Sequence, residues 1–499
     1  MDEIEFGRRQ LTDIEELLPF RKTIIEAAFG LIRMERVDAV ASAERLSKIA
    51  EELKSLRERI EKGKREQAQP SSAPASQPET RPADAPIVVS AVTARRAAGA
   101  ADALRQELRE WYDYHAQFQP EFPWWTRRPY EDASKAIEDY AKFLREEIAG
   151  LKGKDDDPLV GDPIGREALL SDLREEFIAY SPEELVEIGQ RELAWCQVEM
   201  KKIAAAMGAG DDWKAALKKI KEDHVGPGEQ DELVTQFGRN AVEFLKSRDL
   251  ITIPPLCEET WRLFMLSPES QKTLPFAAYG GQSMLVAYAA ESMKHDDKLM
   301  SMRGNNRHFT RIVVPHELIP GHHLQAFMAA RERPYRQLFS TPFLVEGWCL
   351  YWEMLLWDLN YAANDADRLG MLFWRNHRAA RIIVSLKFHL GEMTPQEMVN
   401  FLLENVGMEK FGATSEVRRF IGGDYSPLYQ CGYMIGGLQI RSLRRELVDT
   451  RKMTDREFHD AILKLGPVPI EMIRATLLNA PLKRDHASQW KFAGDVSKP

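Results

Sequence analysis

The chain has 499 residues, of which 44% are hydrophobic and 29% are charged, a composition that is ordinary for a folded globular protein. Its formal net charge of −9 argues against a nucleic-acid-binding surface as the main function. The length is sufficient for about two to four domain-sized units or for one large single-core enzyme.

The four cysteines, Cys196, Cys257, Cys349 and Cys431, lie far apart, so we expect neither a disulfide framework nor a structural zinc knuckle. The sequence contains no run of about 18 uninterrupted apolar residues and therefore predicts no membrane span. The opening residues, MDEIEFGRRQ, lack the apolar core of a signal peptide. We expect a cytoplasmic protein, with an export signal removed from the chain as the alternative.

Apolar residues recur at three- and four-residue steps through residues 10–65, a period typical of helices. Residues 67–86, QAQPSSAPASQPETRPADAP, are rich in proline, alanine and serine and nearly free of large apolar side chains. Such a composition cannot bury a core, so it favours a flexible linker or a long exposed loop. The sequence therefore predicts an N-terminal helical segment over 1–66, a linker over 67–90 and a larger helical domain over 91–499.

The helical period continues from about residue 95 towards the C-terminus. Ser181 with Glu184, and Thr394 with Glu397, have capping-box spacing and predict that two helices begin there. Strand-like stretches are few and short, and they are APIVVSAV at 85–92, ITIPPL at 251–256 and part of TLPFAAYGGQSMLVAY at 273–288. The fold class is therefore predicted to be mainly α, with at most a small β-sheet.

A cluster of metal-ligating side chains occurs in VVPHELIPGHHLQAF, residues 313–327. His316 and Glu317 provide an imidazole and an adjacent carboxylate, as in the H-E-x-x-H helices that bind zinc. In those helices a second histidine follows one turn later, but here Pro320 occupies that position. Neighbouring helix residues point about 100° apart, so a glutamate beside a ligand histidine can act as a base without binding the metal.

The second ligand depends on how the chain passes Pro320 and Gly321. Proline removes a helical hydrogen bond and glycine tolerates unusual backbone angles, so a bulge here can return a later imidazole to the metal side. The next histidines are His322 and His323. We favour His322 as the second ligand, with His323 as the alternative.

The third candidate ligand is Glu346, in the segment TPFLVEGWCLYWEMLLW. This segment is apolar nearly all round, and a glutamate within it is costly to bury unless it is paired or metal-bound. Catalytic zinc takes three protein ligands and leaves a position for water, so Glu346 with the two histidines predicts a Zn²⁺ site. Glu353, two turns on, is a candidate to orient a ligand histidine. The alternative for Glu346 is an ion pair with Arg378 or Arg381.

The motifs HELIPGHHLQ and EGWCLYWE resemble the bacterial family known as domain of unknown function 885, whose members resemble zinc metallopeptidases. The resemblance covers roughly residues 160–485. Its arrangement is similar to that of the gluzincins, such as the peptidases related to thimet oligopeptidase and angiotensin-converting enzyme. Those enzymes have a glycine before the second histidine and a glutamate ligand in a later segment, which supports His322 and Glu346. The resemblance implies a mostly helical body split by a deep cleft with zinc at its floor.

The sequence departs from the family pattern at three positions. Ser385 stands where we expect an aspartate, and Tyr429 stands where we expect a glutamine. Leu350 occupies a position at which gluzincins often have a carboxylate. None of the three changes removes a predicted metal ligand.

The predicted chemistry is metal-assisted hydrolysis of an amide. Zinc at His316, His322 and Glu346 would lower the pKa of its water towards about 7. Glu317 would take the proton and later deliver it to the leaving amine. Tyr433 resembles the tyrosines of gluzincin clefts and is a candidate to stabilise the oxyanion, with packing in YMIGGLQI as the alternative.

Two further residues are candidates to bind substrate. Arg441 has the bidentate guanidinium suited to a substrate carboxylate, with a surface ion pair as the alternative. His389, in LKFHLGE, is a weaker candidate for a proton donor or a substrate contact. The stretch YGGQSM, 279–284, can bind a peptide backbone as an edge strand, or its glycines can simply form a turn.

The sequence thus predicts a zinc-dependent hydrolase, most directly a metallopeptidase for short peptides. One alternative is a metal-binding, catalytically weak protein that binds peptides or acts as a scaffold. Another is a zinc amidohydrolase for a non-peptide amide. We expect no nucleic-acid or membrane partner, and the sequence leaves the oligomeric state open.

Overall fold

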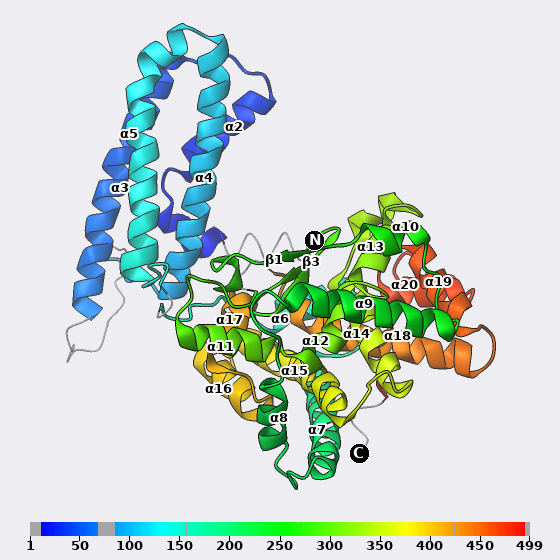
Figure 1. Ribbon diagram of the computed structural model, residues 1–499. Helices are drawn as coiled ribbons and strands as arrows, with labels where there is room; N and C mark the ends of the chain where they lie inside the picture. The colour runs from blue at the N-terminus through cyan, green and yellow to red at the C-terminus, as the bar shows by residue number, and fades with distance from the viewer. Residues whose placement is uncertain (1–10, 68–84, 155–156, 273, 423–424, 495–499) are drawn as a thin grey trace. The chain divides into compact units, whose positions relative to one another are not determined.

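The computed structural model describes residues 11–67, 85–154, 157–272, 274–422 and 425–494 (Figure 1). Within this part of the chain the protein is mainly α-helical and contains a single three-stranded sheet, as the sequence predicts. The chain forms two compact units, Met1–Val160 and Gly161–Pro499, which we call unit 1 and unit 2.

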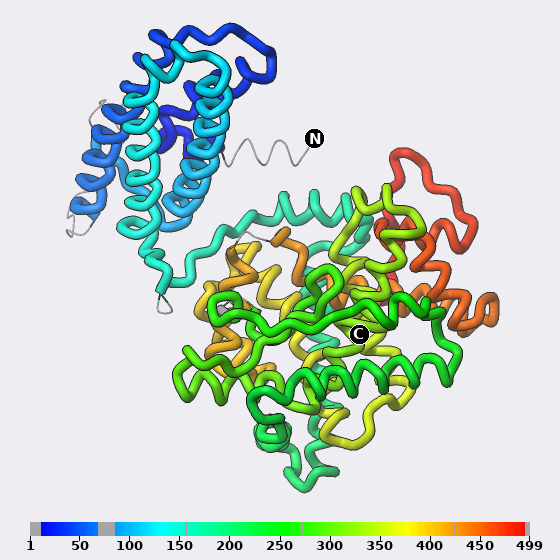
Figure 2. Tube along the Cα trace, turned by 45° about the horizontal axis from the view of Figure 1, so that its top comes forward, coloured from blue at the N-terminus to red at the C-terminus, as the bar shows by residue number. Residues whose placement is uncertain are grey.

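Unit 1 is a bundle of long helices that lie side by side (Figures 1 and 2). Its elements are η1 (Glu15–Leu17), α2 (Arg21–Ile32), α3 (Ala39–Gln67), α4 (Ala91–Phe118), α5 (Glu121–Phe143) and η2 (Leu144–Ile148). Helix α5 packs against α3 and α4, and α2 packs against α4. The apolar stripes of these helices meet in one core that includes Leu53, Leu108, Phe122 and Ile137.

The boundary between the units differs from the predicted division at residues 67–90. Residues 68–84 of the predicted linker lie outside the described residues, and Ile87, just after them, is buried in the bundle core. The Ile87 amide donates to the carbonyl of Arg59, and Ser90 caps α4. The low-complexity stretch therefore lies between two helices of one bundle. The predicted domain over 91–499 is therefore split between the two units, because its first two helices, α4 and α5, share a core with α3 in unit 1.

Unit 2 contains the remaining elements. Its helices and strands are α6 (Arg166–Glu175), α7 (Pro182–Ala206), α8 (Trp213–Lys221), α9 (Gln230–Ser247), α10 (Pro255–Thr260), β1 (Arg262–Met265), η3 (Ser270–Lys272), β2 (Ala277–Tyr279), β3 (Ser283–Val286), α11 (His295–Gly304), α12 (Arg307–Glu317), α13 (His322–Ala329), η4 (Pro334–Phe339), α14 (Pro342–Asp358), α15 (Asp365–His389), α16 (Pro395–Asn405), α17 (Lys410–Ile421), α18 (Tyr429–Arg444), η5 (Arg445–Asp449), α19 (Asp455–Leu465) and α20 (Ile470–Leu477). Both predicted capping boxes are present, at the starts of α7 and α16.

The sheet has the order β1-β3-β2, with β1 parallel and β2 antiparallel to β3. We expected part of residues 273–288 to form an edge strand, and the stretch supplies two strands, of which β2 lies at an edge of the sheet. The other two strand-like stretches do not form strands. Residues 85–90 are irregular and lead into α4, and residues 251–254 lead into the short helix α10. Both stretches contain proline, which removes a donor that a ladder would need, and Pro254 and Pro255 also stand at the start of α10.

Helix α15 is buried along most of its length, and it packs against α7, α12 and α18. Helix α14 lies against α18, and the two backbones meet at Gly347 and Gly436. A Cβ atom on Gly436 would lie 1.8 Å from the carbonyl oxygen of Phe343, so only glycine permits this approach. The crossing fixes how α14 and α18 face the middle of unit 2.

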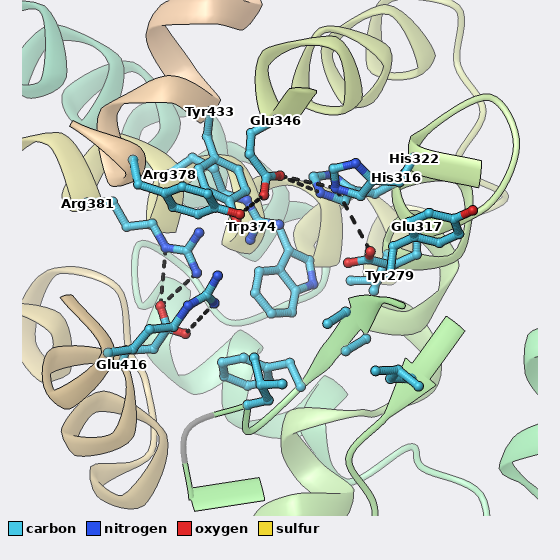
Figure 3. Close-up of a pocket in the computed structure, with 18 of the residues that line it drawn as sticks. Tyr279, His316, Glu317, His322, Glu346, Trp374, Arg378, Arg381, Glu416 and Tyr433 are labelled. Atoms are coloured by element: carbon cyan, nitrogen blue, oxygen red, sulfur yellow. Dashed lines mark hydrogen bonds and ion pairs between the residues drawn. The ribbon is translucent and has the colours of Figure 1, made fainter. Parts of the chain in front are cut away.

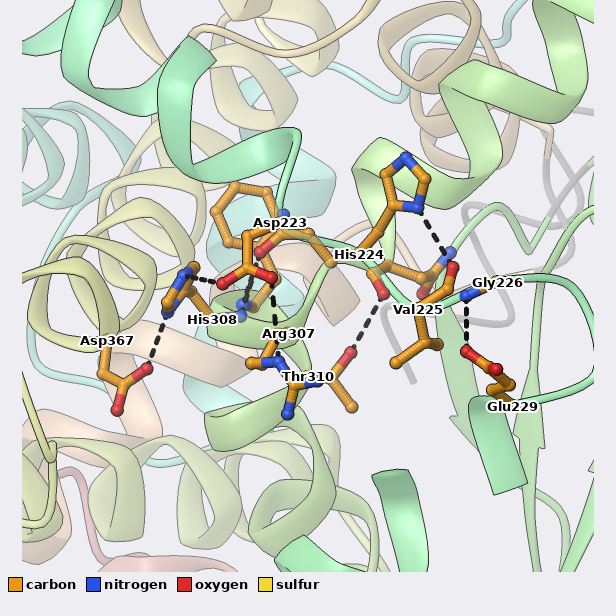
Figure 4. Close-up of polar contacts among 12 residues, drawn as sticks. Asp223, His224, Val225, Gly226, Glu229, Arg307, His308, Thr310 and Asp367 are labelled. Atoms are coloured by element: carbon orange, nitrogen blue, oxygen red, sulfur yellow. Dashed lines mark hydrogen bonds and ion pairs between the residues drawn. The ribbon is translucent and has the colours of Figure 1, made fainter. Parts of the chain in front are cut away.

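The start of α12 is held by a buried histidine between two carboxylates (Figure 4). His308 Nδ1 lies 2.7 Å from Asp367 Oδ1 in α15, and its Nε2 lies 3.1 Å from Asp223 Oδ2, just beyond α8. Asn306 caps the same helix by accepting from the amides of His308 and Phe309. These contacts fix the position of α12 against its neighbours.

All four cysteines are buried and free, in agreement with the predicted absence of disulfides. Among the residues that the structure describes, no helix is both long enough and apolar enough to cross a lipid bilayer.

Candidate metal centre

The predicted bulge at Pro320 and Gly321 is a complete break between two helices. Helix α12 ends at Glu317, and α13 begins at His322. The Gly321 amide donates to the carbonyl of Pro315 at 3.0 Å, which folds the connection back onto the end of α12. A new helix that starts at His322 is free to aim its first side chain back towards His316.

The tight connection requires glycine at position 321. A Cβ atom there would lie 1.7 Å from the carbonyl oxygen of His316, a distance no real side chain can adopt. The indole N–H of Trp348, in α14, donates to the carbonyl of Pro320 at 2.8 Å. The E-G-W motif therefore holds the connection in place from the opposite helix.

Three predicted ligands converge at this point (Figure 3). Glu346 Oε2 lies 3.1 Å from His322 Nε2 and 3.6 Å from His316 Nε2. All three side chains are buried, and Glu317 Oε2 lies 4.0 Å from His322 Nε2. The structure thus brings together the two imidazoles, the carboxylate of α14 and the adjacent glutamate that the motifs single out.

His323, the alternative second ligand, faces away from this cluster. Its Nε2 donates to the carbonyl of Cys257 at 2.9 Å, and its Nδ1 lies 3.2 Å from the hydroxyl of Tyr279. Both ring nitrogens are therefore engaged, and burial lowers the pKa of His323. Of the two neighbouring histidines, only His322 presents a nitrogen to Glu346 and His316.

Glu353 orients His316 from the far side of the ring. Its Oε1 accepts from His316 Nδ1 at 2.7 Å, which leaves Nε2 facing Glu346. Burial alone would lower the pKa of His316, but the carboxylates of Glu346 and Glu353 beside it raise that pKa to about 9. A carboxylate behind a ligand histidine fixes its tautomer and increases its basicity, as in many zinc sites.

The residues present fit a zinc ion. Burial disfavours a charge on Glu346, but His322 and His316 hold the pKa of its carboxyl well below the usual range. Its Oε2 is buried and has no partner with hydrogen-bond geometry in the described part of the chain. Two imidazoles and one buried carboxylate oxygen that face one point match the ligand types and number of catalytic zinc sites.

Cys349 is a further donor next to this cluster. One ligand atom each of His316, His322 and Cys349 lies within 4.8 Å of the other two. The Cys349 thiol donates to the carbonyl of Val345 at 3.5 Å, one turn back in α14. Burial and the nearby carboxylates raise the pKa of Cys349 well above its ordinary value, so the thiol is neutral.

Two tyrosines of α18 flank the cluster. The hydroxyl of Tyr429 donates to Glu346 Oε1, the carboxylate oxygen that faces away from the histidines. The ring of Tyr433 stacks on His316 with a centroid distance of 6.2 Å. Burial raises the pKa of Tyr433 to about 12, so its phenol keeps its proton and remains a donor. Tyr429 thus has a structural partner in a place where the family pattern led us to expect glutamine.

The cluster opens into a cavity of about 340 Å³. Strand β2 lines one side, and residues of α15, α17 and α18 line the other (Figure 3). The cavity also contains three arginines that the sequence did not mark as substrate-binding, namely Arg378, Arg381 and Arg419. Two of them stand three residues apart on α15 and so share one face of that helix, and this spacing was the available signal.

The structure does not bring Arg441 and His389 to the cavity. Arg441 donates to Asp358 at 2.8 Å in a partly exposed ion pair, which was the alternative reading of this residue. It stands more than two turns beyond Tyr433 on α18, roughly 12 Å along the axis. His389 is at the end of α15, about the same distance beyond Arg381, and is buried away from the cavity lining.

A family model described as "Bacterial protein of unknown function (DUF885)" matches residues 7–477, so the match includes unit 1 as well as unit 2. Among curated proteins, none matches the sequence.

Two solved structures share the fold. A candidate lipoprotein of unknown function from Shewanella oneidensis has a TM-score of 0.61 and 18% identity, over 78% of this chain and 73% of that one. A candidate lipoprotein from Colwellia psychrerythraea has a TM-score of 0.58 and 20% identity, over 88% of this chain and 75% of that one. At such identities the likeness concerns the fold alone.

Proposed function

The chain belongs to the bacterial DUF885 family, and from that premise we propose that it is a zinc-dependent peptidase that hydrolyses short peptides. The observation that supports the proposal is the convergence of His316, His322 and Glu346 on one buried point, with Glu317 beside it. When bound there, zinc supplies a Lewis acid that acidifies water and polarises an amide carbonyl.

Residues of the chain would supply the general base, the hydrogen-bond donor to the oxyanion and the carboxylate that orients a ligand. Glu317 lines the cavity with its carboxylate beside His322, where it can take a proton from the attacking water and return it to the leaving amine. Tyr433 can donate a hydrogen bond from its phenol to the oxyanion that develops on the amide, since the hydroxyl of Tyr429 is engaged by Glu346. Glu353 keeps His316 in the orientation that ligand binding needs.

The backbone of strand β2 favours a peptide as the substrate. The carbonyl of Phe276 and the amide of Gly280 face β3, and alternation along the strand therefore turns the backbone groups of Ala277 and Tyr279 to the other edge. Both residues line the cavity. An extended peptide can pair with that edge, as in other cases where a segment adds to a sheet.

The size of the cavity favours small substrates. Its volume of about 340 Å³ is near the lower end of ligand pockets, which run from about 300 to 1,000 Å³. This observation also favours a second candidate function, the hydrolysis of a small acylated amine. A panel of short peptides and acylated amines, compared by kcat/KM, separates the two candidates.

The experiment that tests the peptidase proposal is the Glu317→Gln variant of the zinc-loaded protein. We expect it to retain one zinc per chain, because Glu317 is not a ligand, and to lose peptide turnover by about 10²- to 10⁴-fold. Glu332→Gln, at an exposed position beyond α13, is the matched control and should retain both. Full turnover in Glu317→Gln, or no bound zinc in the unaltered protein, would contradict the proposal.

The cytoplasmic location stays a prediction. Both structural neighbours are described as candidate lipoproteins, and this description supports an exported form of the chain as the second possibility.

A further inference from the structure

The three arginines that line the cavity form a cationic cluster, and Figure 3 shows two of them, Arg378 and Arg381, at the opposite end from the histidines. Arg378 and Arg381 are 5% and 3% exposed, and Arg419 is largely covered. Tyr433 lies between the two ends, with its ring stacked on His316 and its centroid 4.6 Å from the guanidinium carbon of Arg381. The arginines are therefore about one side chain away from the proposed site of hydrolysis.

The carboxylates that the structure describes do not balance this cluster. Glu416 accepts from Arg381 Nη2 at 2.7 Å and Nε at 3.2 Å, and Arg419 lies 3.8 Å from its other oxygen. Arg378 approaches Glu353 only at 3.5 Å, and that carboxylate is already bound to His316. Among the residues that the structure describes, the three guanidinium groups thus share Glu416, which His377 also approaches at 3.3 Å, and part of Glu353.

Several guanidinium nitrogens have no hydrogen-bond partner in the described part of the chain. They are Nε and Nη1 of Arg378, Nη1 of Arg381 and Nε of Arg419, and all are buried. A buried charge without a partner is costly, and a guanidinium is suited to bidentate binding of a planar anion. Among the described residues, the cluster therefore has unused hydrogen-bond donors in a cavity that a ligand can enter.

We propose that Arg378, Arg381 and Arg419 bind a carboxylate of the substrate. This inference rests on the proposed function and specifies its substrate class. The preferred substrates are short peptides or acylated amines that carry a carboxylate close to the scissile amide, on one side of that amide. The carboxylate can be the C-terminus, in which case cleavage occurs near the C-terminal end, or an aspartate or glutamate side chain.

The test uses three matched peptides with the zinc-loaded full chain. They are acetyl-trialanine as the free acid, the same peptide as its C-terminal amide, and an amide in which the last alanine is replaced by aspartate. Binding is measured by calorimetry on Glu317→Gln, and kcat/KM is measured on the unaltered protein. We expect at least tenfold tighter binding of one or both acids than of the neutral amide, and the favoured acid identifies the source of the carboxylate.

Arg419→Gln is the variant that probes the cluster, because this arginine is the least buried and its ion pair is the longest. This variant should reduce the ratio of kcat/KM for the acid to kcat/KM for the neutral amide at least threefold, through a higher KM for the acid. The kcat/KM for the neutral amide should change little. Arg441→Gln, at the arginine paired with Asp358 outside the cavity, is the control and should retain the preference.

Equal binding of the acids and the neutral amide would overturn the inference even if all three are hydrolysed. Preferred binding of an acid without any hydrolysis would instead contradict the proposed function and leave the carboxylate site in place. The two proposals can therefore fail separately.

Discussion

At the level of single side chains, position 321 decides how the metal motif is completed. Pro320 stands where H-E-x-x-H has its second histidine. The chain still brings a second imidazole to the same point, because one helix ends at Glu317 and another begins at His322. Because the connection brings backbone within 1.7 Å of where a Cβ would be, glycine is required at Gly321. The same geometry turns His322 inwards and leaves His323 to bond Cys257 and Tyr279.

His389, a candidate substrate contact in the sequence, is buried at the end of α15 and does not line the cavity. Both of its ring nitrogens lack a partner in the described part of the chain, and burial lowers its pKa to about 4. In the unfolded chain a histidine titrates near 6.5. Below that pH the unfolded state binds a proton that the folded state does not, so the contribution of His389 to stability is present above about pH 6.5 and is lost as the pH falls towards 4.

We therefore predict that His389→Leu makes the protein less sensitive to acid. Between pH 6.5 and 4 the free energy of unfolding should fall by less than in the unaltered protein, and the difference should be up to roughly 3 kcal/mol. This figure follows from about 1.4 kcal/mol for each unit by which the pKa differs between the folded and unfolded states. Urea unfolding followed by tryptophan fluorescence at both pH values measures the difference. His295→Gln, at an exposed histidine of α11, is the control and should decline as the unaltered protein does. An unchanged slope in His389→Leu would show that this residue does not titrate on unfolding.

At the level of helices, the α14–α18 crossing positions the candidate site. Helix α14 carries Glu346 and Glu353, and α18 carries Tyr429 and Tyr433. The two helices approach closely enough for the Tyr429 hydroxyl to reach Glu346, because glycines replace side chains where the backbones meet. The glycine of the E-G-W motif, Gly347, is one of them, so it serves packing between helices.

We predict that Gly436→Ala weakens both folding and zinc binding. The added methyl group would lie 1.8 Å from the carbonyl oxygen of Phe343, so the helices must separate. Overpacking of this kind costs roughly 1–3 kcal/mol of unfolding free energy, measurable by urea titration. Zinc affinity should fall with it, since Glu346 moves with α14. Gly412→Ala in α17 is the matched control, because its Cβ would be in ordinary contact at 3.5 Å. Equal effects of the two substitutions would contradict the proposed role of the crossing.

For the chain as a whole, the division into two units separates the candidate site from the N-terminal bundle. Every proposed ligand, the orienting carboxylate Glu353 and the arginine cluster belong to unit 2. Unit 1 has its own core, formed by the apolar stripes of α2 to α5. The family match nevertheless extends over both units, so the bundle is part of what defines the family.

We predict that each unit folds when it is expressed alone. Residues 161–494 should bind one zinc per chain with the affinity of the full protein, because no proposed ligand lies outside them. Residues 11–160 should be helical by circular dichroism, unfold cooperatively and bind no zinc. Loss of zinc binding in the 161–494 fragment, with its helical content retained, would show that the bundle contributes to the site.

Helical periodicity was sufficient to predict the mainly α fold, and the motifs were sufficient to predict the side chains that meet around Glu346. They succeed because they record local constraints, namely helical periodicity, a glycine that a tight connection requires, and a carboxylate in an apolar helix that needs a partner. Glu353 was also predictable, since it follows Glu346 by two helical turns on the same face.

Only the tertiary structure decided the rest. The end of unit 1 at Val160 depends on α4 and α5 sharing a core with α3, and no local pattern marks such packing. That Arg378, Arg381 and Arg419 line the cavity and Arg441 does not depends on which helix faces point into it. A sequence fixes the order of side chains along each helix, but the distance between side chains of different helices is set by how those helices pack.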